Sequence, residues 1–444
     1  MVELKALLKL ATPLALAQAG QALMGLVDTA VVGRVSDVAQ GAVGLGTGLC
    51  FAFSTLGVGV MLAFDPMLSQ AIGAGNPQRA RTLFWQSVWV ATMAGMLLAL
   101  PLWLSPLMLE PLGVDAELAR GAAEYVTWRV PQLMAFLLFM AARTSLQSDG
   151  RPKAIFFSMV LANLVNFAVS VLLVFGWGPI PAFGVAGAAM GTTVSTWLQL
   201  AVLWSALGRD PEGTSRRLDW VVVRQALKLG LPIGFQLLAE VGVFVLAGIF
   251  AGRLGRSAVA AHQIAINWAS FSFCLAVGIG SAAATRVGWA VGAGDTVAAR
   301  RSGFVAICAG TAWMSSSALF FLLFPRALAR AMTPDPAVIE VTVALLGVAA
   351  VFQISDGLQA VGSGILRGIG DTRFSFLANV AGHWFVGAPV ALFLGVHLSM
   401  GVVGLWWGLS AGLTAVAIAL VVRFFRMTRK PLVSLEAAVD PHAG

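Results

Sequence analysis

The sequence predicts an all-α membrane protein with twelve transmembrane helices in two six-helix lobes. Three observations predict this fold: the composition, twelve apolar runs and an internal repeat. Of the 444 residues, 59% are hydrophobic and only 11% carry charge, whereas a soluble domain carries about 25%. The mean hydropathy of +0.87 excludes an ordinary soluble enzyme and a disordered chain, because too few of the side chains prefer water.

Twelve runs in the chain are long enough to cross a bilayer, which requires about 20 mostly apolar residues in a helix. The runs lie at 8–33, 41–68, 83–108, 122–146, 154–176, 184–207, 225–250, 259–290, 302–325, 338–366, 374–396 and 400–422. The longest polar stretch, from Leu207 to Arg224, separates the first six from the last six. We therefore expect an N-terminal lobe, a linker, a C-terminal lobe and a tail, at 1–207, 208–224, 225–430 and 431–444.

The positions of Lys and Arg predict the orientation. If the N-terminus lies in the cytoplasm, most of the 28 basic residues fall in cytoplasmic segments, which is the usual bias in membrane proteins. The linker and both termini are then cytoplasmic. This bias accounts for the net charge of +8, so we expect a lipid bilayer as the partner of the chain and no nucleic acid.

The second half of the chain repeats the first. A shift of 219 residues places Lys9–Pro13 on Lys228–Pro232 and Gly73–Asn76 on Gly292–Asp295. The glycines are expected to end one helix, and Asn76 and Asp295 to cap the next. Because each half has an even number of spans, both enter the membrane in the same direction. Parallel repeats of this kind are a transporter architecture, with binding sites near the membrane midplane.

Of the twenty acidic residues, sixteen fall in loops, in tails or at the edges of spans, and four lie inside the predicted spans: Asp28, Asp65, Glu240 and Asp356. A carboxylate at the midplane costs roughly 2.5–3.5 kcal/mol on insertion scales. Each must therefore be protonated, meet a cation or face a hydrated cavity. Asp65 differs from the other three, because it lies at the predicted cytoplasmic end of its span, where water or loop arginines are expected to reach it.

Amide side chains share helical faces with three of these acids. Gln21 lies two turns before Asp28, Gln236 lies one turn before Glu240, and Asp356 has Gln353 and Gln359 on its face. These polar stripes indicate a hydrated interior. The alternative is that the polar groups only hold helices together by hydrogen bonds.

Three further polar residues lie within or near predicted spans. Asn163 and Asn166, in the fifth run, either line a cavity of the N-terminal lobe or bond neighbouring helices. A lone His262 at the start of the eighth run is expected to be structural, because no second metal ligand accompanies it in the sequence.

At these residues the chain resembles the multidrug and toxic compound extrusion (MATE) family, in its NorM-like bacterial branch. The resemblance covers nearly the whole chain and depends on several short motifs. These are Pro13 with Gln21 and Val27–Thr29, Ala260–Gln263, Arg286–Gly288 with Gly292–Asp295, and Gly364–Gly368 with Gly370–Asp371. Asp65 is a departure from the family pattern, since related chains often carry threonine there.

The resemblance implies a function and assigns roles to residues. It implies a bacterial inner-membrane transporter that exports cationic amphipathic compounds in exchange for Na⁺ or H⁺. Asp28, Glu240 and Asp356 would couple the ion, with Glu240 and Asp356 as a candidate Na⁺ site, and no cofactor is implied. The candidates for the substrate cavity are Gln21, Gln236, Gln353, Asn163 and Asp65. We expect a monomer.

Two other functions compete with multidrug antiport. One is the export or flipping of a specific metabolite or lipid-linked substrate. The other is a membrane-embedded transferase, which the sequence disfavours because the loops are short, only four histidines exist and no catalytic triad spacing is visible. No Walker motif is present either, so ATP is not expected to drive transport.

Overall fold

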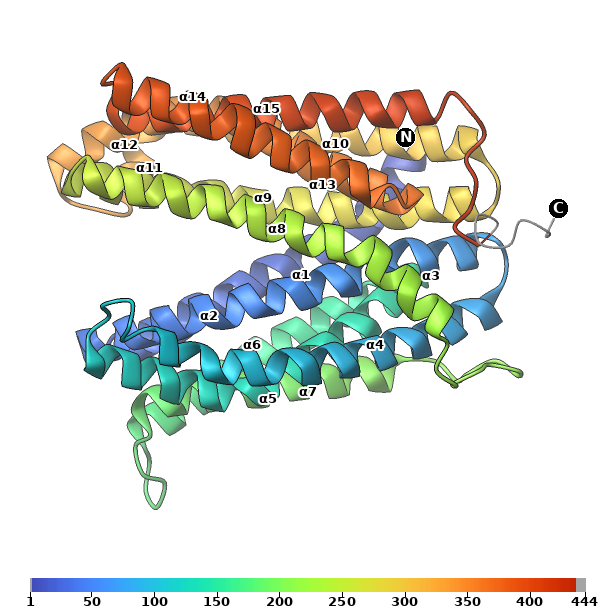
Figure 1. The fold of residues 1–444 in the computed structure, drawn as a ribbon, viewed down its shortest axis with the longest axis horizontal. Helices are drawn as coiled ribbons and strands as arrows, with labels where there is room; N and C mark the ends of the chain where they lie inside the picture. Colours follow the sequence, from blue (N-terminus) through green and yellow to red (C-terminus); the bar gives the residue numbers. More distant parts are fainter. Residues whose placement is uncertain (1, 437–444) are drawn as a thin grey trace. The chain divides into compact units, whose positions relative to one another are not determined.

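The computed structural model describes residues 2–436, and this part of the chain is helical with no β-strand (Figure 1). The first half contains α1 (Val2–Val32), α2 (Asp37–Leu62), α3 (Phe64–Gly73), α4 (Pro77–Leu104), the 3₁₀ helix η1 (Ser105–Met108), α5 (Ala116–Ser148), α6 (Lys153–Phe175) and α7 (Gly184–Ala206). The second half contains α8 (Trp220–Arg253), α9 (Arg256–Gly292), α10 (Thr296–Leu323), α11 (Pro325–Arg330), α12 (Pro336–Ile369), α13 (Thr372–Val380), the π-helix η2 (Ala381–Gly387), α14 (Ala388–Leu392), the π-helix η3 (Phe393–His397) and α15 (Gly401–Met427).

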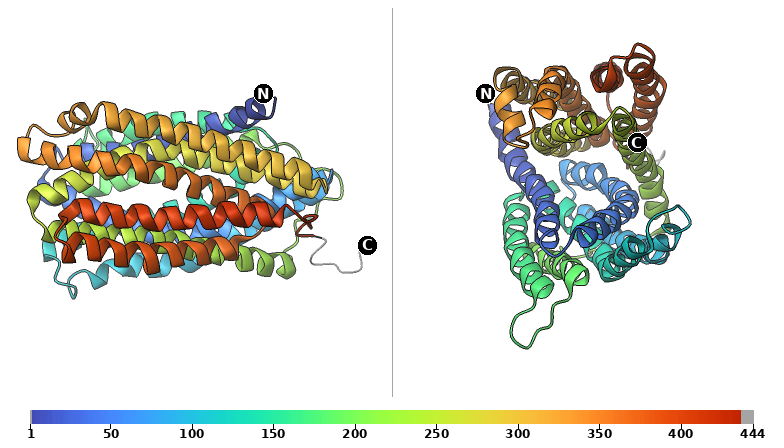
Figure 2. Two further views of the ribbon diagram at one scale, coloured as in Figure 1. Left: turned by 90° about the horizontal axis from the view of Figure 1, so that it is seen from above. Right: turned by 90° about the vertical axis from the view of Figure 1, so that its left-hand side faces the viewer.

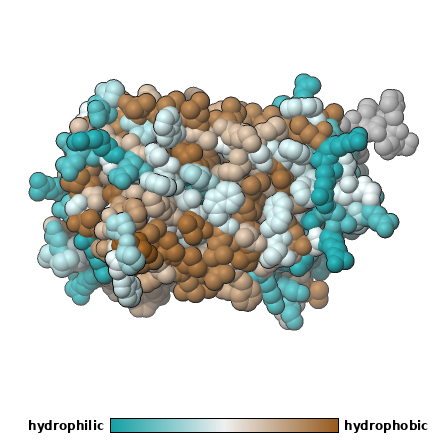
Figure 3. All heavy atoms as spheres, turned by 90° about the horizontal axis from the view of Figure 1, so that it is seen from below, coloured by the Kyte–Doolittle hydropathy of each residue, from teal (hydrophilic) through white to brown (hydrophobic). Residues whose placement is uncertain are grey.

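The predicted number of apolar helices is confirmed. Within the described residues, eleven helical segments are long and apolar enough to cross a membrane, counting α2 with α3 and α13 through η3 as single segments. The twelfth is α7, a 23-residue helix without charged residues whose glycines and hydroxyl side chains lower its hydropathy. On the face drawn in Figure 3, hydrophobic side chains fill the middle and hydrophilic ones gather toward the two ends.

The predicted helix caps are confirmed as well. The Asn76 side chain accepts a hydrogen bond from the backbone N–H of Arg79, and Pro77 occupies the first turn of α4. Asp295, its counterpart in the repeat, accepts from Ala298 N–H. The expected single run at 41–68 is instead divided at Ala63 into α2 and α3.

The described chain forms two compact units, and α1 and α8 each contribute to both. The N-terminal unit comprises residues 16–72 and 76–234, and the C-terminal unit comprises 2–15, 73–75 and 235–436. The divisions in α1 and α8 lie 219 residues apart, two residues beyond Pro13 and Pro232. A proline inside a helix leaves one backbone carbonyl without its partner and favours a bend. The lobe and linker boundaries at 207 and 225 stay a prediction.

Each unit is built around one long helix. In the N-terminal unit α5 packs against α2, α4 and α7, and in the C-terminal unit α12 packs against α9, α10 and α15. Figure 2 shows these bundles from the side and along the helices. The backbones of α9 and α12 approach closely, since a Cβ atom on Gly364 would lie 2.2 Å from the carbonyl oxygen of Gly280. Small residues permit such contacts in membrane helices.

Both ends of the described chain form polar contacts with helices of the C-terminal unit. Glu3 in the first turn of α1 forms an ion pair with Arg286 of α9 at 2.6 Å and accepts a hydrogen bond from Ser302 of α10. At the other end, Leu432 N–H donates to Thr296 Oγ1 at 2.9 Å. The predicted tail at 431–444 falls outside the described residues from 437 onward.

Candidate functional site

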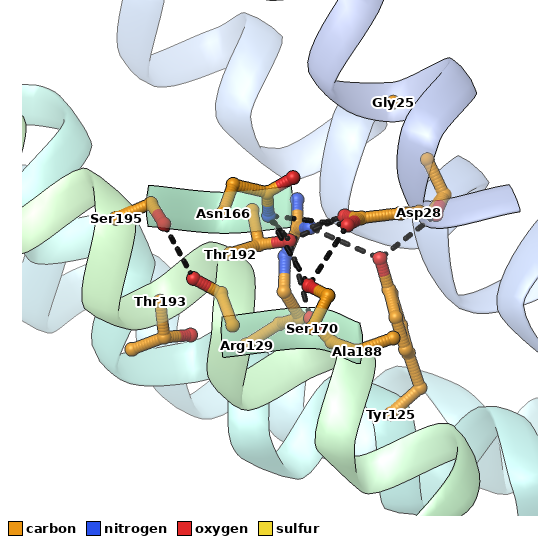
Figure 4. Close-up of polar contacts among 12 residues, drawn as sticks. Gly25, Asp28, Tyr125, Arg129, Asn166, Ser170, Ala188, Thr192, Thr193 and Ser195 are labelled. Atoms are coloured by element: carbon orange, nitrogen blue, oxygen red, sulfur yellow. Dashed lines mark hydrogen bonds and ion pairs between the residues drawn. The ribbon is translucent and has the colours of Figure 1, made fainter. Parts of the chain in front are cut away.

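The N-terminal unit holds Asp28 in a buried polar cluster. Asp28 projects from α1 with 3% of its surface exposed. Asn166 Nδ2 of α6 donates to its carboxylate at 3.1 Å, Ser170 Oγ donates at 3.4 Å, and Thr192 of α7 donates to the other carboxylate oxygen (Figure 4). Three helices thus supply donors to one carboxylate, which offsets part of the cost of keeping a charge away from water.

Arg129 of α5 completes this cluster and was missed in the sequence. Its Nη1 lies 3.9 Å from Asp28 Oδ2, and the same nitrogen donates to the hydroxyl of Tyr125 at 3.0 Å. Tyr125, the single tyrosine of the chain, is fully buried and also accepts from Thr47 Oγ1 of α2. Asp28 therefore meets a cation, one of the three outcomes that its position in the membrane required.

The C-terminal unit brings Glu240 and Asp356 together. Glu240 lies on α8, and Gln359, one turn beyond Asp356 on α12, donates from Nε2 to Glu240 Oε2 at 3.1 Å. The same nitrogen donates to Asn379 Oδ1 of α13 at 2.8 Å. Asp356 is 6% exposed on α12, one turn before Gln359, so this amide joins the two helices that carry the acids. Among the described residues, no Lys or Arg forms an ion pair with either carboxylate.

Two other amides of the predicted stripes lie in this unit. Gln353 is fully buried on α12 and donates to the hydroxyl groups of Ser272 on α9 and Ser317 on α10, the latter at 2.9 Å. Gln236 is buried on α8 one turn before Glu240. Gln353 therefore bonds neighbouring helices, as the alternative interpretation of the polar stripes proposed for such groups.

The remaining candidates lie in the N-terminal unit. Asn163 Nδ2 donates to the backbone oxygens of Gly20 on α1 and Met159 on α6, so this side chain also joins helices. Gln21 is half-buried on α1. Asp65 is 3% exposed and accepts a hydrogen bond from Thr144 Oγ1 of α5 at 3.0 Å.

His262 has a partner that fits the structural role expected for it. Trp406 Nε1 of α15 donates to His262 Nδ1 at 3.1 Å, and both rings are buried among the apolar residues of the C-terminal unit. Within residues 2–436, no group of three or more His, Cys, Asp or Glu side chains is arranged to hold a metal ion.

Comparison with known proteins identifies the family. The model of the MatE family matches residues 13–172 and again residues 232–393. The two matches begin 219 residues apart, the separation found in the repeat. The chain belongs to the MatE family.

Relatives within this family align over almost the whole chain. A probable multidrug resistance protein NorM of Bradyrhizobium diazoefficiens is 37% identical over 438 residues, which cover 95% of this chain and 93% of that protein. The multidrug resistance protein NorM of Burkholderia vietnamiensis is 35% identical with the same coverage. The multidrug resistance protein MdtK of Edwardsiella ictaluri is 31% identical and covers 97% of this chain and 96% of that protein.

Solved structures of MATE transporters share the fold. The bent form of the Vibrio cholerae transporter VcmN superposes with a TM-score of 0.88 at 18% identity, over 96% of this chain and 97% of that one. The eukaryotic transporter AtDTX14 gives a TM-score of 0.85 at 20% identity, over 97% and 98%. This chain therefore has the two-lobe helical fold of these structures. The family match and the relatives described above make this MatE protein a membrane transporter.

Proposed function

We propose that this MatE protein exports cationic amphipathic compounds in exchange for Na⁺ or H⁺. The observation that carries the proposal is that Glu240 and Asp356 both lie in membrane-spanning helices of the C-terminal unit, where Gln359, one turn beyond Asp356, donates to Glu240 Oε2 at 3.1 Å. Two carboxylates that no Lys or Arg of residues 2–436 neutralises attract a cation, which is a proton, a sodium ion or the charged group of a substrate. Asp28 is the third acid of the exchange, in the N-terminal unit.

Competition for these carboxylates accounts for the exchange. When an ion neutralises the acids, they bind a cationic substrate less tightly. Because coupling between two ligands is reciprocal, the bound substrate lowers the affinity for the ion by the same factor. Inward ion flow supplies about 1.4 kcal/mol for each tenfold gradient and about 2.3 kcal/mol for each charge per 100 mV. These gradients are sufficient to drive uphill export without ATP. Rocking of two parallel repeats supplies alternating access in transporters of this architecture.

The relatives support a multidrug substrate range, since several are named multidrug resistance proteins. We infer from the distribution of Lys and Arg that both termini face the cytoplasm, and we expect a monomer. The export or flipping of a particular metabolite or lipid-linked compound is the second candidate function. It makes the same use of the acids but predicts no movement of cationic dyes.

Purified protein in proteoliposomes tests the proposal. A cationic dye such as ethidium is placed on one side, and Na⁺ and pH gradients are imposed separately. We expect one gradient to drive dye uphill and its collapse to stop the movement. Absence of dye movement under both gradients would contradict multidrug antiport and favour the second candidate, whereas substrate turnover without any gradient would indicate an enzyme.

A further inference from the structure

The first half of α8, which follows the linker (Figure 1), presents an exposed face that combines apolar and basic side chains. The exposed apolar residues are Trp220, Val221, Leu227 and Leu231. Arg224 and Lys228 are exposed among them. On a helix of 3.6 residues per turn, these six positions fall within about one third of the circumference. These six residues are called the α8 face.

The opposite side of the same helix is packed within the N-terminal unit. Ala226 and Leu229 are buried there. A Cβ atom on Gly230 would lie 2.5 Å from the Cα atom of Val60, so the backbones of α8 and α2 are in close contact. This packing fixes the rotation of α8 about its axis, and the α8 face is held outward.

No acidic side chain compensates the two basic residues of the α8 face. Neither Arg224 nor Lys228 forms an ion pair within residues 2–436. Asp219, the nearest acid in the chain, instead accepts a hydrogen bond from Val221 N–H at the start of the helix. Arg224 and Lys228 lie about one turn apart, where like charges repel each other. An anion that contacts both side chains removes this repulsion.

The length of α8 places its exposed face where lipid headgroups meet acyl chains. The helix has 34 residues and is therefore about 51 Å long, whereas the hydrocarbon core of a bilayer is about 30 Å thick. It extends beyond the core by roughly 10 Å at each end, or about seven residues. Trp220 and Arg224 then lie at the headgroups, where tryptophan is enriched. Leu231 lies among the acyl chains, and the long side chain of Lys228 reaches back to the headgroups.

We propose that the α8 face binds an anionic phospholipid. Its phosphate lies between Arg224 and Lys228, and its acyl chains lie along Leu227 and Leu231. Basic residues beside a membrane-spanning helix attract anionic lipids in this way. By the predicted orientation, the lipid belongs to the cytoplasmic leaflet.

Charge complementarity selects this occupant over others. An amphipathic cation is repelled by the two basic side chains, and a zwitterionic phospholipid carries a cation of its own beside the phosphate. An anionic phospholipid supplies both the negative charge and the apolar chains that the α8 face requires. The inference goes beyond the proposed antiport and does not depend on it.

Native mass spectrometry tests the charge requirement. The purified protein is titrated with phosphatidylglycerol or with phosphatidylcholine of the same acyl chains. We expect the wild-type protein to bind phosphatidylglycerol about tenfold more tightly, because each basic residue near a membrane surface adds a several-fold attraction for anionic lipid. The double variant Arg224→Gln with Lys228→Gln should lose this preference.

The matched control is the double variant Arg326→Gln with Arg330→Gln. It removes two exposed basic residues of the same spacing on α11, where Arg326 is already paired with Glu340. The control should keep the preference for phosphatidylglycerol. Equal binding of both lipids by the wild-type protein would overturn the proposal, and so would an unchanged preference after the change of Arg224 and Lys228. A dimer that this change abolishes, with no lipid retained, would assign the α8 face to a second copy of the chain instead.

Photocrosslinking of the wild-type protein locates the lipid without a variant. Proteoliposomes of phosphatidylcholine contain a trace of phosphatidylglycerol with a diazirine in one acyl chain, and labelled peptides are identified by mass spectrometry. We expect labels at Leu227 and Leu231 that excess unlabelled phosphatidylglycerol suppresses and excess phosphatidylcholine does not. Labels confined to other helices, or suppressed equally by both lipids, would contradict a site on α8. Both measurements read lipid binding, so they stand whether or not a gradient drives dye export.

Discussion

Asp28 lies beside a cation, Arg129, whereas within the described residues no Lys or Arg forms an ion pair with Glu240 or Asp356. Arg129 stays charged at any physiological pH, so the cluster around Asp28 carries little net charge. In the C-terminal unit, Glu240 accepts a hydrogen bond from the amide of Gln359, and no Lys or Arg of the described chain forms an ion pair with it or with Asp356. The two units therefore differ at the level of single residues, and the C-terminal pair is the one that requires an exchangeable cation.

Replacing Arg129 with glutamine should destabilise the N-terminal unit. The change leaves a buried carboxylate without its cation, and breaking a buried pair from one side costs about 3–5 kcal/mol. We expect a thermal unfolding midpoint several degrees below wild type, measured by fluorescence-detected size exclusion. The double variant Asp28→Asn with Arg129→Gln should recover most of the loss, because neither charge remains. If the double variant is as unstable as the single one, Arg129 stabilises the protein through packing rather than through Asp28.

The sequence revealed the acids and did not reveal Arg129, the cation beside Asp28. Asp28, Glu240 and Asp356 were visible because a carboxylate in an apolar run is costly. The same cost applies to Arg129, a basic residue within the predicted run at 122–146. The pairing of Arg129 with Asp28 depends on how α5 lies beside α1, which no sequence pattern displays.

At the scale of elements, the linker is docked on α4 of the N-terminal unit. Asp210 accepts hydrogen bonds from Arg81 and Trp85 of α4 and from Arg216 within the linker. Gln86 of α4 donates to Arg217 O and accepts from Asp219 N–H. Desolvation raises the pKa of Asp210, but the bonds from Arg81, Arg216 and Trp85 outweigh it, so the pKa lies below its ordinary value.

Asp210→Asn should release the linker. A hydrogen bond to a charged group contributes about 1.5–3 kcal/mol, so we expect trypsin to cleave at Arg209, Arg216 and Arg217 about tenfold faster than in wild type. Glu212→Gln, at an exposed position of the same loop, is the matched control. Unchanged cleavage of Asp210→Asn would show that the bonds of Gln86 hold the linker alone.

The pH dependence of this docking follows from the lowered pKa. Because the folded-state pKa of Asp210 lies below the unfolded value, its contribution is fully present above the unfolded value, about 3.9, and is lost as the pH falls through the folded-state value. Wild-type cleavage by trypsin should therefore show no linker release between pH 6 and 9, and pepsin should detect release only below about pH 4.

At the scale of the whole molecule, composition and the repeat predicted the helices and their number. Apolar runs of about 20 residues determine which segments can cross a bilayer, and Asn76 and Asp295 mark helix starts by their chemistry. The assignment of the first half of α1 to the C-terminal unit was not predictable. It depends on tertiary contacts such as that of Glu3 with Arg286, which join residues far apart in the sequence.

Cysteine labelling tests the orientation. In a chain whose three native cysteines are replaced by alanine, a cysteine at the exposed Ser215 should resist impermeant thiol reagents added outside intact cells. Ala182 lies just before α7 and the linker follows α7, so the two positions are at opposite ends of this helix. A cysteine at Ala182 is therefore predicted to face the outside and should react with the same reagents. The reverse pattern would invert the predicted topology.

The most direct measurement of the central claim is the gradient-driven export by Asp356→Asn in proteoliposomes beside the wild-type protein. Asparagine is similar in size and needs no counter-ion, so the variant should fold and still bind ethidium. We expect uphill dye movement to fall at least ten-fold while dye binding stays measurable in the same preparation. Transport by Asp356→Asn at the wild-type rate under the same gradient would show that Asp356 only packs the C-terminal unit, and ion coupling through the acid pair would be wrong.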